Sequence, residues 1–278
     1  MRDAQTVTRP DGTRLALRWW RPDTRPLASV VVLHGLGEHI GRYERLARAL
    51  VRTGLAVYGF DQRGHGESPG PRARFRSLDE LVSDAAAVVS TVREEQAGPW
   101  ALFGHSLGGL VALRAVQGGT LRPDALVLSS PFLRRSSMPH PVVQQLALAL
   151  APIAPWLPAQ RLDPEAMSRD PSAVEAYRSD PLILHGPVRL DAAAATLRGA
   201  RAAMAPDEPT LRLPTLVLHG SADRVADPKR AEALARRNPG VTLHLEPDGH
   251  HELFNDTCRE FITGVLVRWL KVRLNGAL

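Results

Sequence analysis

One stretch constrains the fold of this chain more than any other, PWALFGHSLGGLVALRAV at residues 99–116. Its first half predicts a buried strand, its second half a helix, and Gly104 to Gly109 a tight turn between them. The G-x-S-x-G spacing places Ser106 on this turn, and the small flanking residues allow it to be sharp. A serine hydroxyl is a good nucleophile only when a base takes its proton. The stretch therefore predicts a histidine and an orienting acid elsewhere in the chain.

Five more short, near-continuous apolar runs resemble this strand, at residues 28–35, 55–61, 124–130, 214–220 and 241–247. Such runs are typical of parallel strands that are buried on both faces. Helical patterns occur between most of them and at the end, at residues 43–53, 78–96, 107–116, 229–238 and 261–272. Residues 5–20 alternate apolar and polar around Asp11-Gly12, which favours an antiparallel hairpin. We therefore predict an α/β fold with a mostly parallel, doubly wound sheet.

One interval is too long for a single crossover helix. About eighty residues separate the strand that ends near Ser130 from the one that begins near Pro214. Asp163, Asp170 and Asp180 each precede a proline, a pattern typical of a helix N-terminus, and residues 191–204 predict an alanine-rich helix. We interpret residues 132–209 as a helical lid, or cap, inserted into a core made of residues 1–131 and 210–278.

Composition narrows the possible partners. The apolar fraction is 44% and the net charge is +6, and nearly all of the excess is arginine scattered along the chain. This scatter argues against a nucleic-acid-binding stripe. The single cysteine, Cys258, excludes an intrachain disulfide and a thiolate metal site, so we expect it to serve packing. We expect no metal or other cofactor. The N-terminal residues lack an apolar signal core, and prolines interrupt the uncharged stretch at residues 136–160, so we expect a cytoplasmic protein.

In a sheet of this kind, catalytic side chains follow the carboxyl ends of strands. Asp223 lies in the loop after residues 214–220, and His250 and His251 follow residues 241–247. The chain order of nucleophile, acid and base is then Ser106, Asp223 and a histidine, which is the α/β-hydrolase order. From position alone, either histidine can be the base.

Five segments resemble the signature segments of monoacylglycerol lipases and bacterial lysophospholipase-like hydrolases: HGLGEHIGRY, DQRGHGES, GHSLGG, GSADR and HHELFND, between residues 34 and 256. The resemblance implies the α/β-hydrolase fold and selects His251 as the base, because the family histidine directly precedes Glu-Leu or Glu-Ile. It also implies that the backbone N–H of Leu36 joins that of Leu107 in stabilising the oxyanion. His34 and Gly35 are expected to shape the turn beside Leu36.

The resemblance also places the pair matching Glu38 and Arg42 near the polar end of the substrate, although an i,i+4 ion pair explains the spacing equally well. Asp61, Arg63 and His65 are interpreted as a loop-fixing network. The apolar stretch from Val142 to Trp156 either packs on the core or provides an acyl-binding wall and a membrane-facing surface. In the second case its candidate substrate-binding residues are Val142, Leu146, Leu150 and Trp156.

The sequence therefore favours a cofactor-independent serine esterase that acts on acyl esters of glycerol or similar alcohols, with possible peripheral membrane contact through the lid and an undetermined oligomeric state. One alternative is an aminopeptidase on the same scaffold, which needs an acidic group for the substrate amine, with Glu165 and Glu175 as candidates. The other alternative is a non-enzymatic binding protein with the hydrolase fold.

Overall fold

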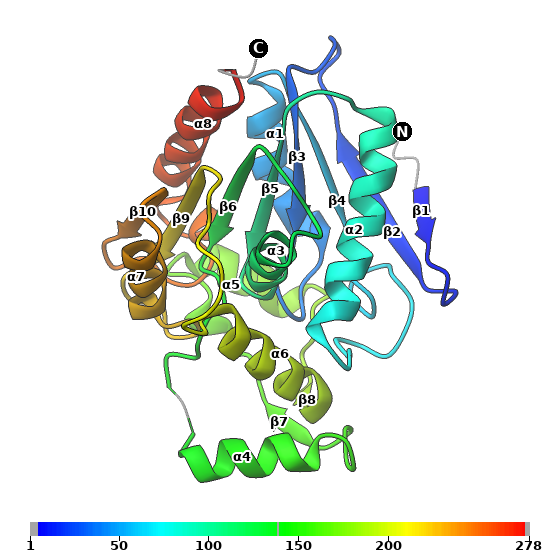
Figure 1. Cartoon of the computed structure of the whole chain (residues 1–278), viewed down its shortest axis with the longest axis vertical. Helices are drawn as coiled ribbons and strands as arrows, with labels where there is room; N and C mark the ends of the chain where they lie inside the picture. The colour runs from blue at the N-terminus through cyan, green and yellow to red at the C-terminus, as the bar shows by residue number, and fades with distance from the viewer. Residues whose placement is uncertain (1–4, 138, 276–278) are drawn as a thin grey trace.

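An eight-stranded sheet forms the centre of the computed structural model, which describes residues 5–137 and 139–275 (Figure 1). The spatial order of the strands is β1-β2-β4-β3-β5-β6-β9-β10. Their bounds are β1 Gln5–Thr8, β2 Arg14–Trp20, β3 Ala28–Leu33, β4 Leu55–Phe60, β5 Trp100–His105, β6 Ala125–Ser129, β9 Thr215–Gly220 and β10 Val241–Glu246. β1 and β2 form the predicted antiparallel hairpin, β2 runs antiparallel to β4, and the remaining neighbours are parallel.

Helices cover both faces of the sheet because its strands present apolar side chains to both. In β3, Val31 and Leu33 belong to one buried cluster and Val30 and Val32 to another. The first cluster is covered by α2 (Leu78–Glu95), α3 (Leu107–Gln117) and α7 (Pro228–Arg237). The second is covered by α1 (Glu44–Val51), which follows the short helix η1 (Ile40–Tyr43), and by η3 (Leu253–Asn255) and α8 (Arg259–Asn275). The predicted doubly wound α/β architecture is confirmed.

One strand differs from its prediction. β10 was expected to be buried on both faces, but none of its residues is fully buried. It is the edge strand and pairs only with β9 within the sheet. The polar side chains of Thr242, His244 and Glu246 on this strand fit an edge position, where one side of the strand remains open to solvent.

The long segment between β6 and β9 contains α4 (Pro141–Leu150), β7 (Pro158–Gln160), η2 (Pro164–Ala166), α5 (Pro171–Ser179), β8 (Val188–Arg189) and α6 (Leu190–Ala203). The predicted alanine-rich helix is therefore present as α6. Ala192, Ala195 and Ala200 of α6 join the core cluster that also contains α2 and α3. Small side chains allow this close packing, since a β-carbon at Gly199 would lie 2.6 Å from Leu78.

Two of the three Asp-Pro pairs begin helices as predicted, because Asp163 caps η2 and Asp170 caps α5. The prediction for Asp180 is wrong. Asp180 follows the end of α5, and its carboxylate accepts a hydrogen bond from the backbone N–H of Leu182 in a turn. The same carboxylate lies 2.8 Å from His39 Nε2. Asp-Pro is also typical of turns, and here the Asp180 carboxylate both closes a turn and contacts His39.

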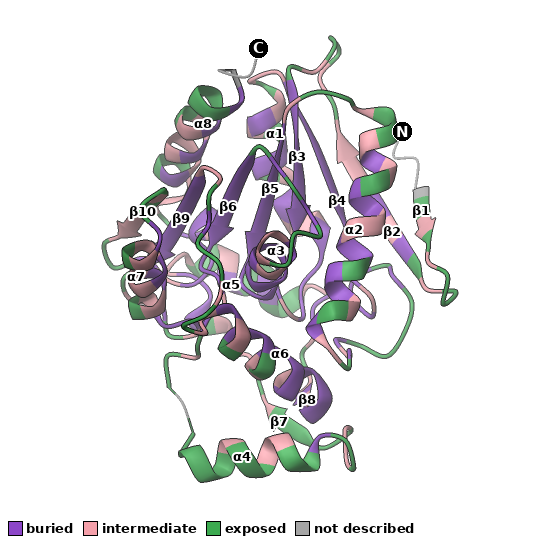
Figure 2. Cartoon of the chain, in the orientation of Figure 1, coloured by how far each residue is buried: buried purple, intermediate pink, exposed green. Residues whose placement is uncertain are grey.

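α4 is the first helix of the inserted segment, lies farthest from the sheet at the bottom of Figure 2, and is largely exposed. Only Ala147 and Leu148 pack toward a small cluster that includes Leu190 and Ala194. The large apolar side chains of Leu146 and Ile153 are 59% and 73% exposed. Within residues 5–137 and 139–275, no helix combines the length and apolar character needed to cross a membrane.

Candidate active site

Ser106 lies on the turn between β5 and α3, in a backbone conformation that few non-glycine residues adopt. Its φ is 51° and its ψ is −115°. Two glycines make the turn possible, since a β-carbon at Gly104 would lie 2.3 Å from the carbonyl oxygen of Gly108, and one at Gly108 would lie 2.2 Å from that of Leu33. The strain at Ser106 points to a functional constraint on this turn.

His251 and Asp223 meet Ser106 from two other strand ends. His251 Nε2 lies 2.9 Å from Ser106 Oγ, and His251 Nδ1 lies 2.8 Å from Asp223 Oδ2. The loop after β9 fixes Asp223, because its Oδ1 accepts hydrogen bonds from the backbone N–H groups of Val225 and Ala226. All three side chains are almost completely buried. The hydroxyl, the imidazole and the carboxylate thus form one continuous hydrogen-bonded chain.

The structure distinguishes between the two adjacent histidines by position. His250 is held away from Ser106, with its backbone N–H donating to Asp256 Oδ2 at 2.9 Å. Within the described part of the chain, its buried Nδ1 has no hydrogen-bond partner. His251 alone of the pair contacts both Ser106 and Asp223.

The pKa values of His251 and of the neighbouring His105 are shifted in opposite directions. Burial disfavours the charged form of His251, but the charge and hydrogen bond of Asp223, together with the charges of Glu252 and Glu38, outweigh burial and raise the pKa of His251 above its usual 6.5. Burial also opposes ionisation of Asp223, but His251 and His219 hold the pKa of that carboxyl well below its usual range. For His105, burial and then the charge of His251 lower the pKa to about 4. At neutral pH, His105 is therefore an uncharged neighbour of the ionisable pair.

Two backbone N–H groups are available beside Ser106. Leu36 follows β3, Leu107 is the first residue of α3, and both line the same cavity as Ser106. In the described ranges, no group accepts a hydrogen bond from either backbone N–H. A helix N-terminus adds a favourable field for negative charge at Leu107.

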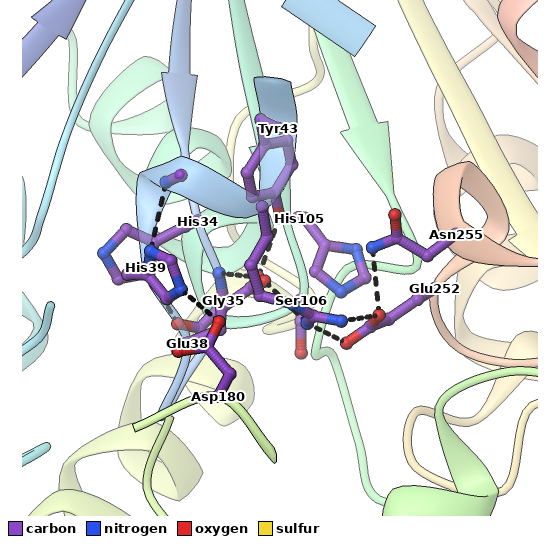
Figure 3. Close-up of polar contacts among 12 residues, drawn as sticks. His34, Gly35, Glu38, His39, Tyr43, His105, Ser106, Asp180, Glu252 and Asn255 are labelled. Atoms are coloured by element: carbon purple, nitrogen blue, oxygen red, sulfur yellow. Dashed lines mark hydrogen bonds and ion pairs between the residues drawn. The ribbon is translucent and has the colours of Figure 1, made fainter. Parts of the chain in front are cut away.

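Glu38 and Arg42 form a buried brace with Glu252, which directly follows His251 (Figure 3). Arg42 lies 3.1 Å from Glu38 and makes two hydrogen bonds of 2.5 and 2.7 Å with Glu252. Glu38 accepts hydrogen bonds from the backbone N–H of Gly35 at 2.6 Å and from the Tyr43 hydroxyl at 2.8 Å. The brace therefore ties the loop that carries Leu36 to the loop that carries His251.

Burial raises the pKa of Glu38, but Arg42, the nearby histidines and the hydrogen bond from Gly35 together outweigh burial and lower the pKa to about 2. Glu38 is thus ionised at neutral pH and shares the positive charge of Arg42 with Glu252. Breaking a buried ion pair on one side typically costs about 3–5 kcal/mol because it leaves a charge uncompensated. The sequence predicted the Glu38–Arg42 pair from its spacing. It did not predict the role of Glu252, whose only signal was its place after His251.

A cavity of about 890 Å³ opens above Ser106, His251 and Leu36. Ala193, Leu197 and Ala200 of α6 contribute to its apolar lining, as does Met204 just after this helix. Val142, Leu146, Leu150 and Trp156 are not among the described residues that line it. Contrary to the expectation for an acyl-binding wall, the side chains of these four residues are exposed, and α4 packs toward Leu190 and Ala194 of α6 through Ala147 and Leu148.

The other candidates from the sequence lie outside this cavity. Asp61 holds its loop by accepting hydrogen bonds from the backbone N–H groups of Ile40 and Glu67, and Arg63 pairs with Asp84, as expected of a loop-fixing network. Glu165 is exposed and pairs with Arg178, and Glu175 is also exposed. Neither glutamate is among the described lining residues.

Comparisons with known proteins agree on one family. The family model described as Hydrolase_4, serine aminopeptidase, S33, matches residues 24–258. A monoacylglycerol lipase of Mycolicibacterium smegmatis is 34% identical over 93% of this chain and 93% of its own length. A monoglyceride lipase of Rattus norvegicus is 33% identical over 91% of this chain and 85% of its own length.

A solved structure agrees with these relatives. The monoacylglycerol lipase of Paleococcus ferrophilus superposes with a TM-score of 0.82 at 31% identity, covering 93% of this chain and 99% of that one. The matched residues include Ser106, Asp223 and His251, since the family model spans residues 24–258. The chain therefore belongs to the serine aminopeptidase S33 family of hydrolases and has the α/β-hydrolase fold.

Proposed function

We propose that this protein is a serine esterase that hydrolyses acyl esters of glycerol or of similar small alcohols. The observation that carries the proposal is the hydrogen-bonded chain from Ser106 through His251 to Asp223, which lies at the base of a largely apolar cavity. The relatives named monoacylglycerol lipase support the same substrate class.

In the proposed reaction, Ser106 Oγ attacks the ester carbonyl carbon while His251 Nε2 takes the hydroxyl proton. Asp223 holds the imidazole in the required tautomer and stabilises its charged form. The N–H groups of Leu36 and Leu107 stabilise the oxyanion. His251 then gives its proton to the leaving alcohol, and water hydrolyses the acyl-enzyme by the same steps, which releases the fatty acid.

Residues 132–209 act in this proposal as a cap over the strand ends, between core segments 1–131 and 210–278. The α6 side chains Ala193, Leu197 and Ala200 line the cavity and would contact the acyl chain. The cavity suits an aminopeptidase less well, because a free carboxylate would be needed to bind the substrate amine. Two of its carboxylates, Glu38 and Glu252, are already bound by Arg42.

A substrate panel tests the reaction class. We expect hydrolysis of monoacylglycerols, lysophospholipids and aryl esters, and none of aminoacyl amides. With p-nitrophenyl esters of increasing chain length, kcat/KM should rise about fourfold per methylene until the cavity is filled, because each buried methylene contributes about 0.8 kcal/mol. Highest activity on aminoacyl amides would favour the peptidase alternative, and a preference for the acetyl ester would contradict acyl binding by the cap.

We also propose that α4 contacts a lipid surface. Gln144 of this helix lines the cavity. The exposed apolar side chains of Leu146, on the same helix, and of Ile153, in the turn just after it, therefore lie close in sequence to a residue of the substrate site. Replacing both by Asp should weaken co-sedimentation with phosphatidylcholine and phosphatidylglycerol vesicles by about tenfold or more, since each exposed chain contributes about 1.5–3 kcal/mol when buried. Leu27→Asp, at an exposed apolar residue before β3, is the matched control. Equal binding by both variants would refute this contact.

A further inference from the structure

The lining of the cavity above Ser106 is rich in arginine. Six guanidinium groups line it, those of Arg134, Arg135, Arg161, Arg201, Arg224 and Arg230. The lining also contains the carboxyl groups of Glu38, Glu252 and Asp163. Arg42 pairs with both Glu38 and Glu252, so these three side chains together carry a net charge of −1. Together with Asp163, this leaves two negative charges against the six positive charges of the lining.

Three of the six arginines already have polar partners. Arg134 lies 3.1 Å from Asp227, Arg224 lies 3.9 Å from Asp163, and Arg201 donates to the side-chain oxygen of Gln144.

Arg135 and Arg230 differ from these, because both are partly buried and neither has an acidic partner within residues 5–137 and 139–275. A guanidinium that loses part of its hydration is normally compensated by an anion. Among the six arginines of the lining, Arg135 and Arg230 are therefore the two that combine partial burial with the lack of an acidic partner in the described ranges, whereas Arg161 is exposed.

Backbone pairing places these two arginines beside the loop that carries Asp223. The segment after β6 pairs with the segment after β9, with Ser136 N–H donating to the Val225 carbonyl at 3.1 Å and Asp227 N–H donating to the Arg134 carbonyl at 2.9 Å. Arg135 belongs to the first segment, and Arg230 belongs to α7, which follows the second. Their charges therefore lie at the same edge of the sheet as the Ser106 turn, where the strand ends meet.

We propose that Arg135 and Arg230 form a subsite for a phosphate group on the substrate, so that acyl esters of a phosphorylated glycerol are preferred to neutral ones. This proposal rests on the proposed esterase function. Guanidinium groups bind phosphate through paired, charge-assisted hydrogen bonds, which are stronger than neutral ones. The apolar α6 side chains Ala193, Leu197 and Ala200 line the same cavity and would contact the acyl chain.

The test compares kcat/KM for 1-acylglycerol and 1-acylglycerol 3-phosphate that carry the same acyl chain, each as dissolved monomer. We expect the wild type to prefer the phosphate ester by about tenfold or more, mainly through KM, and this preference should shrink as salt is added. In the double variant Arg135→Gln/Arg230→Gln, the ratio of the two kcat/KM values should fall close to one.

A matched double variant, Arg122→Gln/Arg212→Gln, removes the same net charge from exposed residues before β6 and β9, at the opposite edge of the sheet. It should keep the preference. A wild type that hydrolyses both esters equally, or an unchanged ratio in the Arg135/Arg230 variant, would overturn the subsite. If the wild type hydrolysed neither ester, the proposed esterase function itself would be overturned.

Discussion

Ser106→Ala is expected to lower kcat for ester hydrolysis by about 10⁶-fold, because it removes the nucleophile while the oxyanion donors and the cavity remain. Wild-type protein should react covalently with a fluorophosphonate probe at Ser106, and the variant should not. The unusual backbone of this turn imposes no new cost on the variant, since alanine and serine share the same steric restriction at positive φ. Thermal unfolding of the two proteins checks that the fold is retained.

Ser137→Ala is the matched control, because Ser137 is exposed in the segment after β6. This variant should be labelled and active like the wild type. Labelling of Ser106→Ala at full strength would show that the probe reacts elsewhere and would end the assignment of Ser106 as nucleophile.

His251→Ala is expected to lower kcat by about 10⁴-fold or more, whereas His250→Ala should stay within about tenfold of the wild type. The reason is geometric, since His251 contacts both Ser106 and Asp223, and the backbone N–H of His250 is held by Asp256. The opposite pattern of losses would make His250 the base and would contradict the arrangement in the structure.

The pH profile provides a second measurement of the same base. Protonated His251 cannot accept the Ser106 proton, so kcat/KM should fall as the pH drops through the pKa of His251. Because Asp223 raises that pKa, the fall should be centred above 6.5. Asp223→Asn should move the midpoint to lower pH and reduce activity, because the carboxylate no longer stabilises the charged ring. An unchanged midpoint in Asp223→Asn would contradict this coupling.

Contacts between residues that are close in the sequence can be predicted from local sequence patterns. The turn at Ser106 was predictable because Gly104 and Gly108 leave the space that its sharp backbone requires. Likewise, the Glu38–Arg42 pair followed from helical spacing. The third member of that brace, Glu252, lies 210 residues from Arg42, and no local pattern links the two.

The inserted segment shows the opposite case. The apolar stretch from Val142 to Trp156 suggests an acyl-binding wall, yet Gln144 is the one described residue of this stretch in the cavity lining, to which α6 contributes Ala193, Leu197 and Ala200. The hydrophobicity of a side chain predicts that burying it is favourable in free energy, but it does not predict which surface the side chain packs against. Asp180 is a similar case, because its carboxylate contacts His39, which lies 141 residues away in the chain.

The alternation of strands and helices, the sharp turn at Ser106 and the order of the three candidate catalytic residues follow from the amino-acid sequence, because each depends on local periodicity or on which strand end a residue follows. Three features appear in the folded chain alone: the residues that line the cavity, the link that Arg42 makes between two loops, and the position of Arg135 and Arg230 in the cavity without an acidic partner in the described ranges. Those features depend on contacts between distant segments, whose geometry is set by packing of the whole core.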